Sequence, residues 1–123
     1  MEKTILVVED DISLRSALVD KLSHEGFLVL EASNGEEGLA QVQTQKPDLI
    51  LLDIVMPRMD GVAMLKALRA TPEGKDTKVI VLTNLGENDK VAEAVELGAY
   101  DYLVKSDWKI KDVIAKVRGV LGT

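Results

Sequence analysis

The chain has 123 residues, 46% of them hydrophobic, which is a size that one domain with a single core can bury. It contains no cysteine and one histidine, which excludes disulfides, thiolate zinc sites and multi-histidine metal sites, so any metal would be bound by oxygen. The formal net charge of −6 argues against direct nucleic-acid binding, and no apolar stretch is long enough for a signal peptide or a membrane span, so we expect a cytoplasmic protein.

Five short apolar runs occur along the chain, and each is rich in Val, Ile or Leu with little alternation of polar and apolar residues. This pattern is typical of strands that are covered on both faces of a parallel sheet. The runs comprise residues 5–8, 27–30, 49–52, 79–82 and 100–104. We therefore predict five strands, most of them buried.

Apolar residues with helical spacing follow each run. They are Leu14, Leu18 and Leu22 in the first segment, Leu39 and Val42 in the second, Met64, Leu65 and Leu68 in the third, Val91, Ala94 and Val95 in the fourth, and Ile110, Val113, Ile114, Val117 and Leu121 in the fifth. Ser13, Asn34 and Asp60 are expected to cap the first three helices, and Gly26 and Gly98 to end the first and fourth. The alternation predicts an α/β fold, a three-layer α/β/α sandwich around a doubly wound, five-stranded parallel sheet.

Polar residues stand at the carboxyl ends of the predicted strands, where an open parallel sheet forms its ligand-binding crevice. They are Glu9, Asp10, Asp53, Thr83 and Lys105. Two carboxylates about 5 Å apart repel by roughly 3 kcal/mol at an effective dielectric of about 20, so the acids predict a bound cation. Ligation by oxygen alone favours Mg²⁺. An aspartate beside Mg²⁺ can attack phosphorus, with a hydroxyl and an ammonium binding the phosphoryl oxygens.

Four motifs in chain order carry a resemblance to a known family. They are the acidic pair within residues 7–11, the loop of residues 53–57 followed by Asp60 and Gly61, the hydroxyl of Thr83, and the aromatic and lysine of residues 102–105. Over nearly all of residues 1–123 the sequence resembles the receiver domain of bacterial two-component response regulators. Each motif is weak alone, but the four together are specific.

This resemblance implies a role for each matching residue. Asp53 would be the phosphoacceptor, Lys105 and Thr83 would bind the phosphoryl group, and Thr83 and Tyr102 would form the switch. Mg²⁺ would be held by Glu9 through water and by Asp10, Asp53 and the backbone carbonyl of Val55 directly. The resemblance also implies the flavodoxin-like sheet order 2-1-3-4-5.

The function implied by the resemblance is phosphorelay signalling. A histidine kinase or a histidine phosphotransfer protein would donate the phosphoryl group, and an output protein would bind the fourth helix, fifth strand and fifth helix. Such a domain is a switch rather than an enzyme, although it promotes its own aspartyl phosphorylation and dephosphorylation. We expect no direct contact with nucleic acid or membrane.

Some positions depart from the family pattern. Ser106 stands where the family usually has a cis proline, and a cis bond before a non-proline residue costs about 2.5–4 kcal/mol. Asn84 is bulkier than the usual small residue, so access to the phosphoacceptor is expected to differ. Val55 and Leu85 are apolar where a polar residue would orient an attacking water, which favours a longer-lived acyl phosphate.

Two other functions remain open from the sequence alone. A phosphatase with an aspartate nucleophile would also use Mg²⁺, but it would want a second acid two residues after Asp53, where this chain has Val55. A scaffold that works without phosphorylation would tolerate a degenerate pocket, and only Ser106 and Asn84 favour it.

Overall fold

The structure, a computed structural model, describes residues 2–84, 87–105 and 109–122. Five parallel strands form one sheet in the order β2-β1-β3-β4-β5, as predicted. The strands are β1 (Thr4–Val8), β2 (Leu28–Ala32), β3 (Leu49–Asp53), β4 (Lys78–Thr83) and β5 (Asp101–Val104). The helices are α1 (Ile12–His24), α2 (Gly35–Gln45), α3 (Gly61–Arg69), α4 (Asn88–Glu96) and α5 (Ile110–Leu121).

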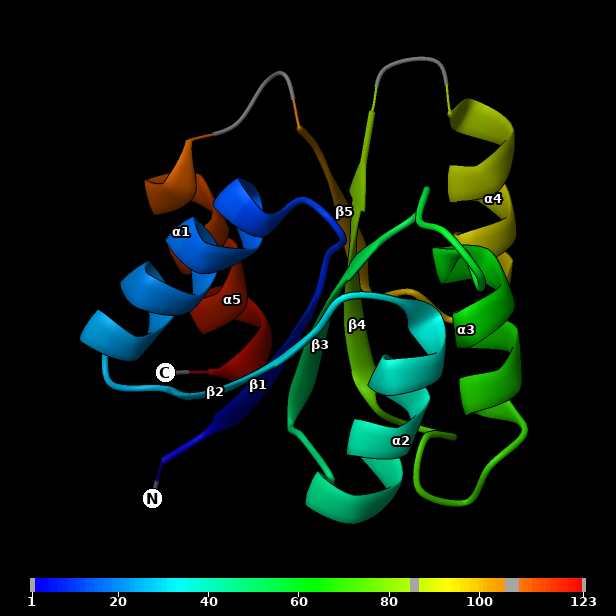
Figure 1. The fold of residues 1–123 in the computed structure, drawn as a ribbon, viewed down its shortest axis with the longest axis horizontal. Coiled ribbons are helices and arrows are strands. Elements are labelled where there is room, and N and C mark those ends of the chain that lie inside the picture. Colours follow the sequence, from blue (N-terminus) through cyan, green and yellow to red (C-terminus); the bar gives the residue numbers. More distant parts are fainter. Residues whose placement is uncertain (1, 85–86, 106–108, 123) are drawn as a thin grey trace.

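Helices cover both faces of the sheet. Figure 1 shows α1 and α5 on one side of the strands and α2, α3 and α4 on the other. The predicted three-layer sandwich is therefore confirmed. Within the described ranges, no helix has the length and apolar character needed to cross a membrane.

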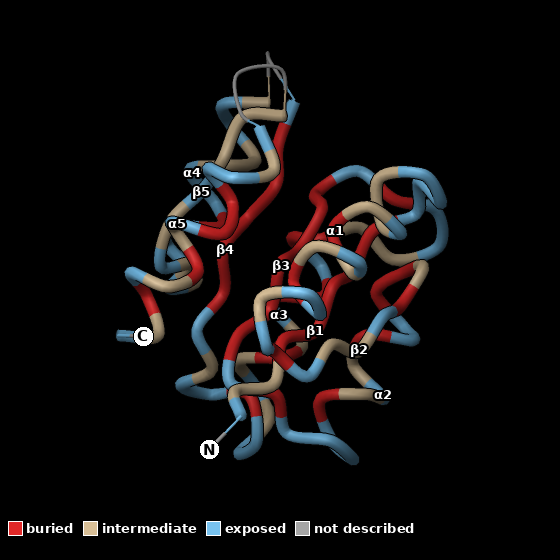
Figure 2. Tube along the Cα trace, turned by 90° about the vertical axis from the view of Figure 1, so that its left-hand side faces the viewer, coloured by how far each residue is buried: buried red, intermediate tan, exposed pale blue. Residues whose placement is uncertain are grey.

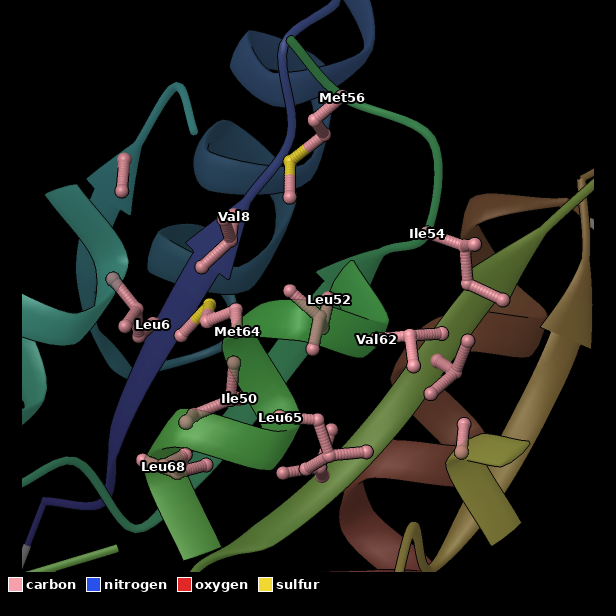
Figure 3. Packing of buried hydrophobic residues seen from close by; sticks show 14 of the residues in the cluster. Leu6, Val8, Ile50, Leu52, Ile54, Met56, Val62, Met64, Leu65 and Leu68 are labelled. Carbon is pink, nitrogen blue, oxygen red and sulfur yellow. The ribbon is translucent and has the colours of Figure 1, made fainter. Parts of the chain in front are cut away.

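The central strands β1, β3 and β4 are buried on both faces, whereas the edge strands β2 and β5 are partly exposed. Successive residues of one central strand enter two different cores. In β1, Ile5 and Val7 pack with residues of α1 and α5, whereas Leu6 and Val8 pack with residues of α2 and α3. Figure 2 shows the central strands as the buried interior, and Figure 3 shows the core beside α3. Both faces of β1 must be apolar, which explains why the sequence shows no alternation there.

Side-chain caps start the first three helices. Asn34 accepts a hydrogen bond from the backbone N–H of Glu37 at 3.0 Å, and Asp60 accepts one from Ala63 at 2.8 Å, so both predicted caps are confirmed. The prediction of Ser13 as a cap was wrong, because α1 starts at Ile12 and Asp11 caps it. The connection from β1 is shorter than expected, so the acidic residue that ends it takes the capping position.

The second strand is shifted relative to the predicted run of residues 27–30. Phe27 lies just before β2, where its N–H donates to the carbonyl of Leu22, and its buried ring lies 5.2 Å from the Arg118 guanidinium carbon. The strand continues through Glu31 to Ala32 because these residues pair with Val7 and Val8 of β1. Strand pairing therefore sets this boundary more than local hydrophobicity does.

The loop that follows Asp53 turns tightly against the start of α3. The N–H of Gly61 donates to the carbonyl of Ile54 at 2.7 Å, and a Cβ on Gly61 would lie 2.3 Å from the carbonyl oxygen of Asp53. Backbone atoms have little room to move, so we expect Gly61→Ala to lower the free energy of unfolding by about 1–3 kcal/mol. Urea denaturation measures the change.

Gly119 is the matched control for that substitution. It is an exposed residue of α5, and a Cβ there would meet no atom within 4 Å. We expect Gly119→Ala to raise the free energy of unfolding by about 0.5–1 kcal/mol because alanine favours the helix. An increase in the free energy of unfolding for both variants would show that the close approach at Gly61 has no energetic consequence.

Candidate functional site

Three carboxylates meet at the carboxyl edge of the sheet. Glu9 follows the last residue of β1, Asp53 ends β3, and these two strands are neighbours through the pairing of Val8 with Leu52. One carboxylate oxygen from each of Glu9, Asp10 and Asp53 lies within 4.8 Å of the other two. Glu9 and Asp53 are buried, whereas Asp10 is exposed.

Lys105 joins two of these acids. Its Nζ atom lies 2.8 Å from Oε1 of Glu9 and 2.9 Å from Oδ1 of Asp53. The backbone supports this position, because the N–H of Lys105 donates to the carbonyl of Thr83 at 2.7 Å, just beyond the last residue of β5. The structure thus brings a lysine from one strand end to acids from two others, as the sequence predicted.

Burial and mutual contact change the acid–base properties of the site. Burial is the largest cause that raises the pKa of Asp53 to about 8, and the neighbouring Glu9 raises it too, whereas Lys105 opposes the change. For Lys105, burial acts to lower the pKa, but the contacts with Glu9 and Asp53 outweigh burial and raise it. Without a bound cation, the raised pKa favours the protonated form of the Asp53 carboxyl near neutral pH.

The carboxylates fit a hard divalent cation. Among contacts from the described residues, Oε1 of Glu9 and Oδ1 of Asp53 accept no well-aligned hydrogen bond, although both lie close to the Lys105 ammonium. Buried carboxylate oxygens with unused lone pairs are suited to ligate a metal. Glu9 and Asp10 with Asp53 thus offer the oxygen-only donor set that Mg²⁺ prefers.

The two predicted switch residues make no hydrogen bond to Glu9, Asp10 or Asp53 among the described residues. Thr83 is buried at the end of β4, but its hydroxyl donates to Oε1 of Glu87 at 2.8 Å, with the carbonyl of Asn84 at 3.2 Å. Tyr102 in β5 is 47% exposed. A cavity of about 100 Å³ lies between them, lined by Thr83, Asn84, Asn88, Val91, Tyr102 and Val104.

The remaining predicted positions divide into described and undescribed ones. Val55 and Asn84 are exposed. The metal-ligand role of the Val55 carbonyl and the effect of Asn84 on access to Asp53 stay predictions. Leu85 and Ser106 lie outside the described residues, so the expectations attached to them also stay predictions.

Two residues contact the site although the sequence did not single them out. Arg15 of α1 donates to the backbone carbonyl of Glu9 at 2.8 Å and to the carboxylate of Glu31 in β2 at 3.0 Å, so it holds the end of β1 in place. Glu87 accepts a hydrogen bond from the Thr83 hydroxyl. An arginine inside a helix and an acid before a helix are ordinary in sequence, so only their tertiary contacts distinguish them.

Comparisons with known proteins agree with this geometry. A family model described as the response regulator receiver domain matches residues 5–118. The chain is 40% identical over 120 residues to a probable transcriptional regulator ycf27 of Cyanophora paradoxa, covering 98% of this chain and 48% of that protein. It is 38% identical over 121 residues to the alkaline phosphatase synthesis transcriptional regulatory protein PhoP of Bacillus subtilis, covering 98% and 49%.

Solved structures give the same result for the fold. The chemotaxis protein CheY4 of Vibrio cholerae has a TM-score of 0.90 and 31% identity, covering 98% of this chain and 99% of that one. The chain spans about half the length of the curated relatives it matches. With the family match across residues 5–118, the chain belongs to the receiver domain family of two-component response regulators, which act in phosphorelay signalling.

Proposed function

We propose that this receiver domain accepts a phosphoryl group on Asp53 from a histidine kinase or a histidine phosphotransfer protein, with Mg²⁺ as the cofactor. The observation that carries the proposal is the contact of the Lys105 ammonium with both Asp53 and Glu9, beside the exposed Asp10. A buried nucleophilic carboxylate, a fixed cation and further acids for a metal are the groups that phosphoryl transfer to aspartate needs.

The chemistry assigned to the residues is a displacement at phosphorus. A carboxylate oxygen of Asp53 forms a bond to phosphorus while the bond from phosphorus to the donor's imidazole nitrogen breaks, and the electron pair returns to that nitrogen. Lys105 stays within reach of the phosphoryl oxygens and offsets their charge. Water attack on the acyl phosphate reverses the modification, so the domain promotes both its own phosphorylation and its own dephosphorylation.

Four groups would hold the metal in this proposal. They are the carboxylates of Glu9, Asp10 and Asp53 and the backbone carbonyl of Val55, with Glu9 acting through water. Bound Mg²⁺ supplies positive charge that aligns the phosphoryl oxygens and keeps Asp53 ionised despite its burial.

Phosphorylation would change the surface formed by α4, β5 and α5. In this proposal the Thr83 hydroxyl turns to the phosphoryl group, and Tyr102 moves from its exposed position into the adjoining cavity. The two conformations would present different surfaces to an output protein. We propose no direct contact of this domain with nucleic acid, in keeping with its net charge of −6.

Intact-protein mass spectrometry after incubation with acetyl phosphate and Mg²⁺ tests the assignment. We expect the wild-type chain to gain one phosphoryl mass, and Asp53→Asn or chelation of the metal to abolish the gain. Asp20→Asn is the control, because Asp20 is an exposed aspartate of α1. Retention of the added mass by Asp53→Asn would reject Asp53 as the acceptor.

A further inference from the structure

The carboxylate of Glu87 binds the hydroxyl that the proposed function assigns to the phosphoryl group. Oε1 of Glu87 accepts from the Thr83 hydroxyl at 2.8 Å and from the backbone N–H of Asn84 at 2.7 Å. Glu87 precedes α4 at the capping position, yet its side chain makes no capping hydrogen bond to that helix. The side chain instead reaches back to the end of β4.

The direction of the Thr83 hydrogen bond follows from the chemistry of its partner. A carboxylate oxygen accepts, and the Thr83 hydroxyl donates to Oε1 of Glu87 at 2.8 Å, a shorter contact than the 3.2 Å to the carbonyl oxygen of Asn84. A hydroxyl has one proton to donate, and phosphoryl oxygens also only accept. Thr83 therefore cannot donate to Glu87 and to a phosphoryl group on Asp53 at the same time.

We propose that Glu87 is a positioning residue that holds Thr83 in the unphosphorylated arrangement and competes with the phosphoryl group for its hydroxyl. This inference rests on the proposed function. Glu87 thereby sets the fraction of molecules that are ready to accept the modification, because a ligand's apparent affinity falls with the fraction of competent protein.

Beryllofluoride, a mimic of the phosphoryl group, measures this competition in the presence of Mg²⁺ by isothermal titration calorimetry. Hydrogen bonds to charged acceptors shift such equilibria by about tenfold or more, so we expect Glu87→Ala to bind beryllofluoride about tenfold more tightly than the wild-type chain. Glu87→Gln keeps a neutral acceptor of nearly the same shape and should give a smaller gain. Glu93→Ala, on the exposed face of α4, should leave the affinity unchanged.

A double-mutant cycle with Thr83→Val separates competition from a general effect of charge or loop structure. We expect the gain from Glu87→Ala or Glu87→Gln to disappear when Thr83 has no hydroxyl. A gain of the same size in both backgrounds, no gain, or a weaker affinity would each overturn the role of Glu87. Failure of the proposed function has a different signature, namely wild-type protein that does not bind beryllofluoride or Asp53→Asn that binds it equally well.

Discussion

Replacing Lys105 by methionine should lower the free energy of unfolding of the metal-free protein by about 3–5 kcal/mol at pH 8. The Lys105 ammonium lies 2.8 Å from Glu9 and 2.9 Å from Asp53, and both carboxylates are almost fully buried. Removing the cation leaves two neighbouring buried acids without a positive charge, which is the costly way to break a buried ion pair. Chemical denaturation in the presence of a chelator measures the loss.

Two comparisons make the Lys105 result specific. Lys116→Met breaks a partly exposed pair with Asp101, also 2.9 Å long, and should cost less than about 1 kcal/mol. The loss of unfolding free energy in Lys105→Met should shrink when Mg²⁺ is added, because the ion offsets the negative charge. It should also shrink when the pH falls toward 5, because Asp53 becomes protonated. Equal losses for the two lysine variants would mean that burial does not set the strength of the Lys105 contacts.

Asp53→Asn should stabilise the metal-free protein by about 2–5 kcal/mol at pH 8.5. Burial and Glu9 raise the pKa of Asp53 from 3.8 to about 8 in the folded protein. Each pKa unit corresponds to about 1.4 kcal/mol of free energy. Asparagine is neutral at every pH, so it removes the free energy that ionising this buried position requires.

The pH dependence of the free energy of unfolding has a defined sign. Between about pH 4 and pH 8 Asp53 binds more protons in the folded protein than in the unfolded chain, so its contribution to the free energy of unfolding falls as the pH rises and levels off above pH 8. The advantage of Asp53→Asn should therefore be small at pH 4 and largest above pH 8. Stability curves from urea denaturation that run parallel for the two proteins across this range would contradict the raised pKa.

Much of the fold follows from local sequence. The apolar runs and the helical spacing predicted the five strands, the five helices and the layered arrangement, and the sheet order implied by the family resemblance is also confirmed. These features are predictable because a strand buried on both faces must be apolar throughout, and because a helix that covers a sheet must have one apolar face. The predicted caps succeeded at Asn34 and Asp60 and failed at Ser13, where the shorter connection placed Asp11 at the helix start.

The sequence by itself determined which chemical groups this protein has at its strand ends. Strands that alternate with helices run parallel, and this places Glu9, Asp53 and Lys105 at one edge of the sheet. Only the tertiary structure decided how they meet. It brought the lysine between two buried acids, and it buried Asp53 beside Glu9, which raised the pKa of Asp53. It also paired the Thr83 hydroxyl with Glu87 instead of with the acidic site. Direction and burial of a side chain depend on neighbours distant in the chain, and these contacts decide whether a carboxylate is protonated and where a hydroxyl points.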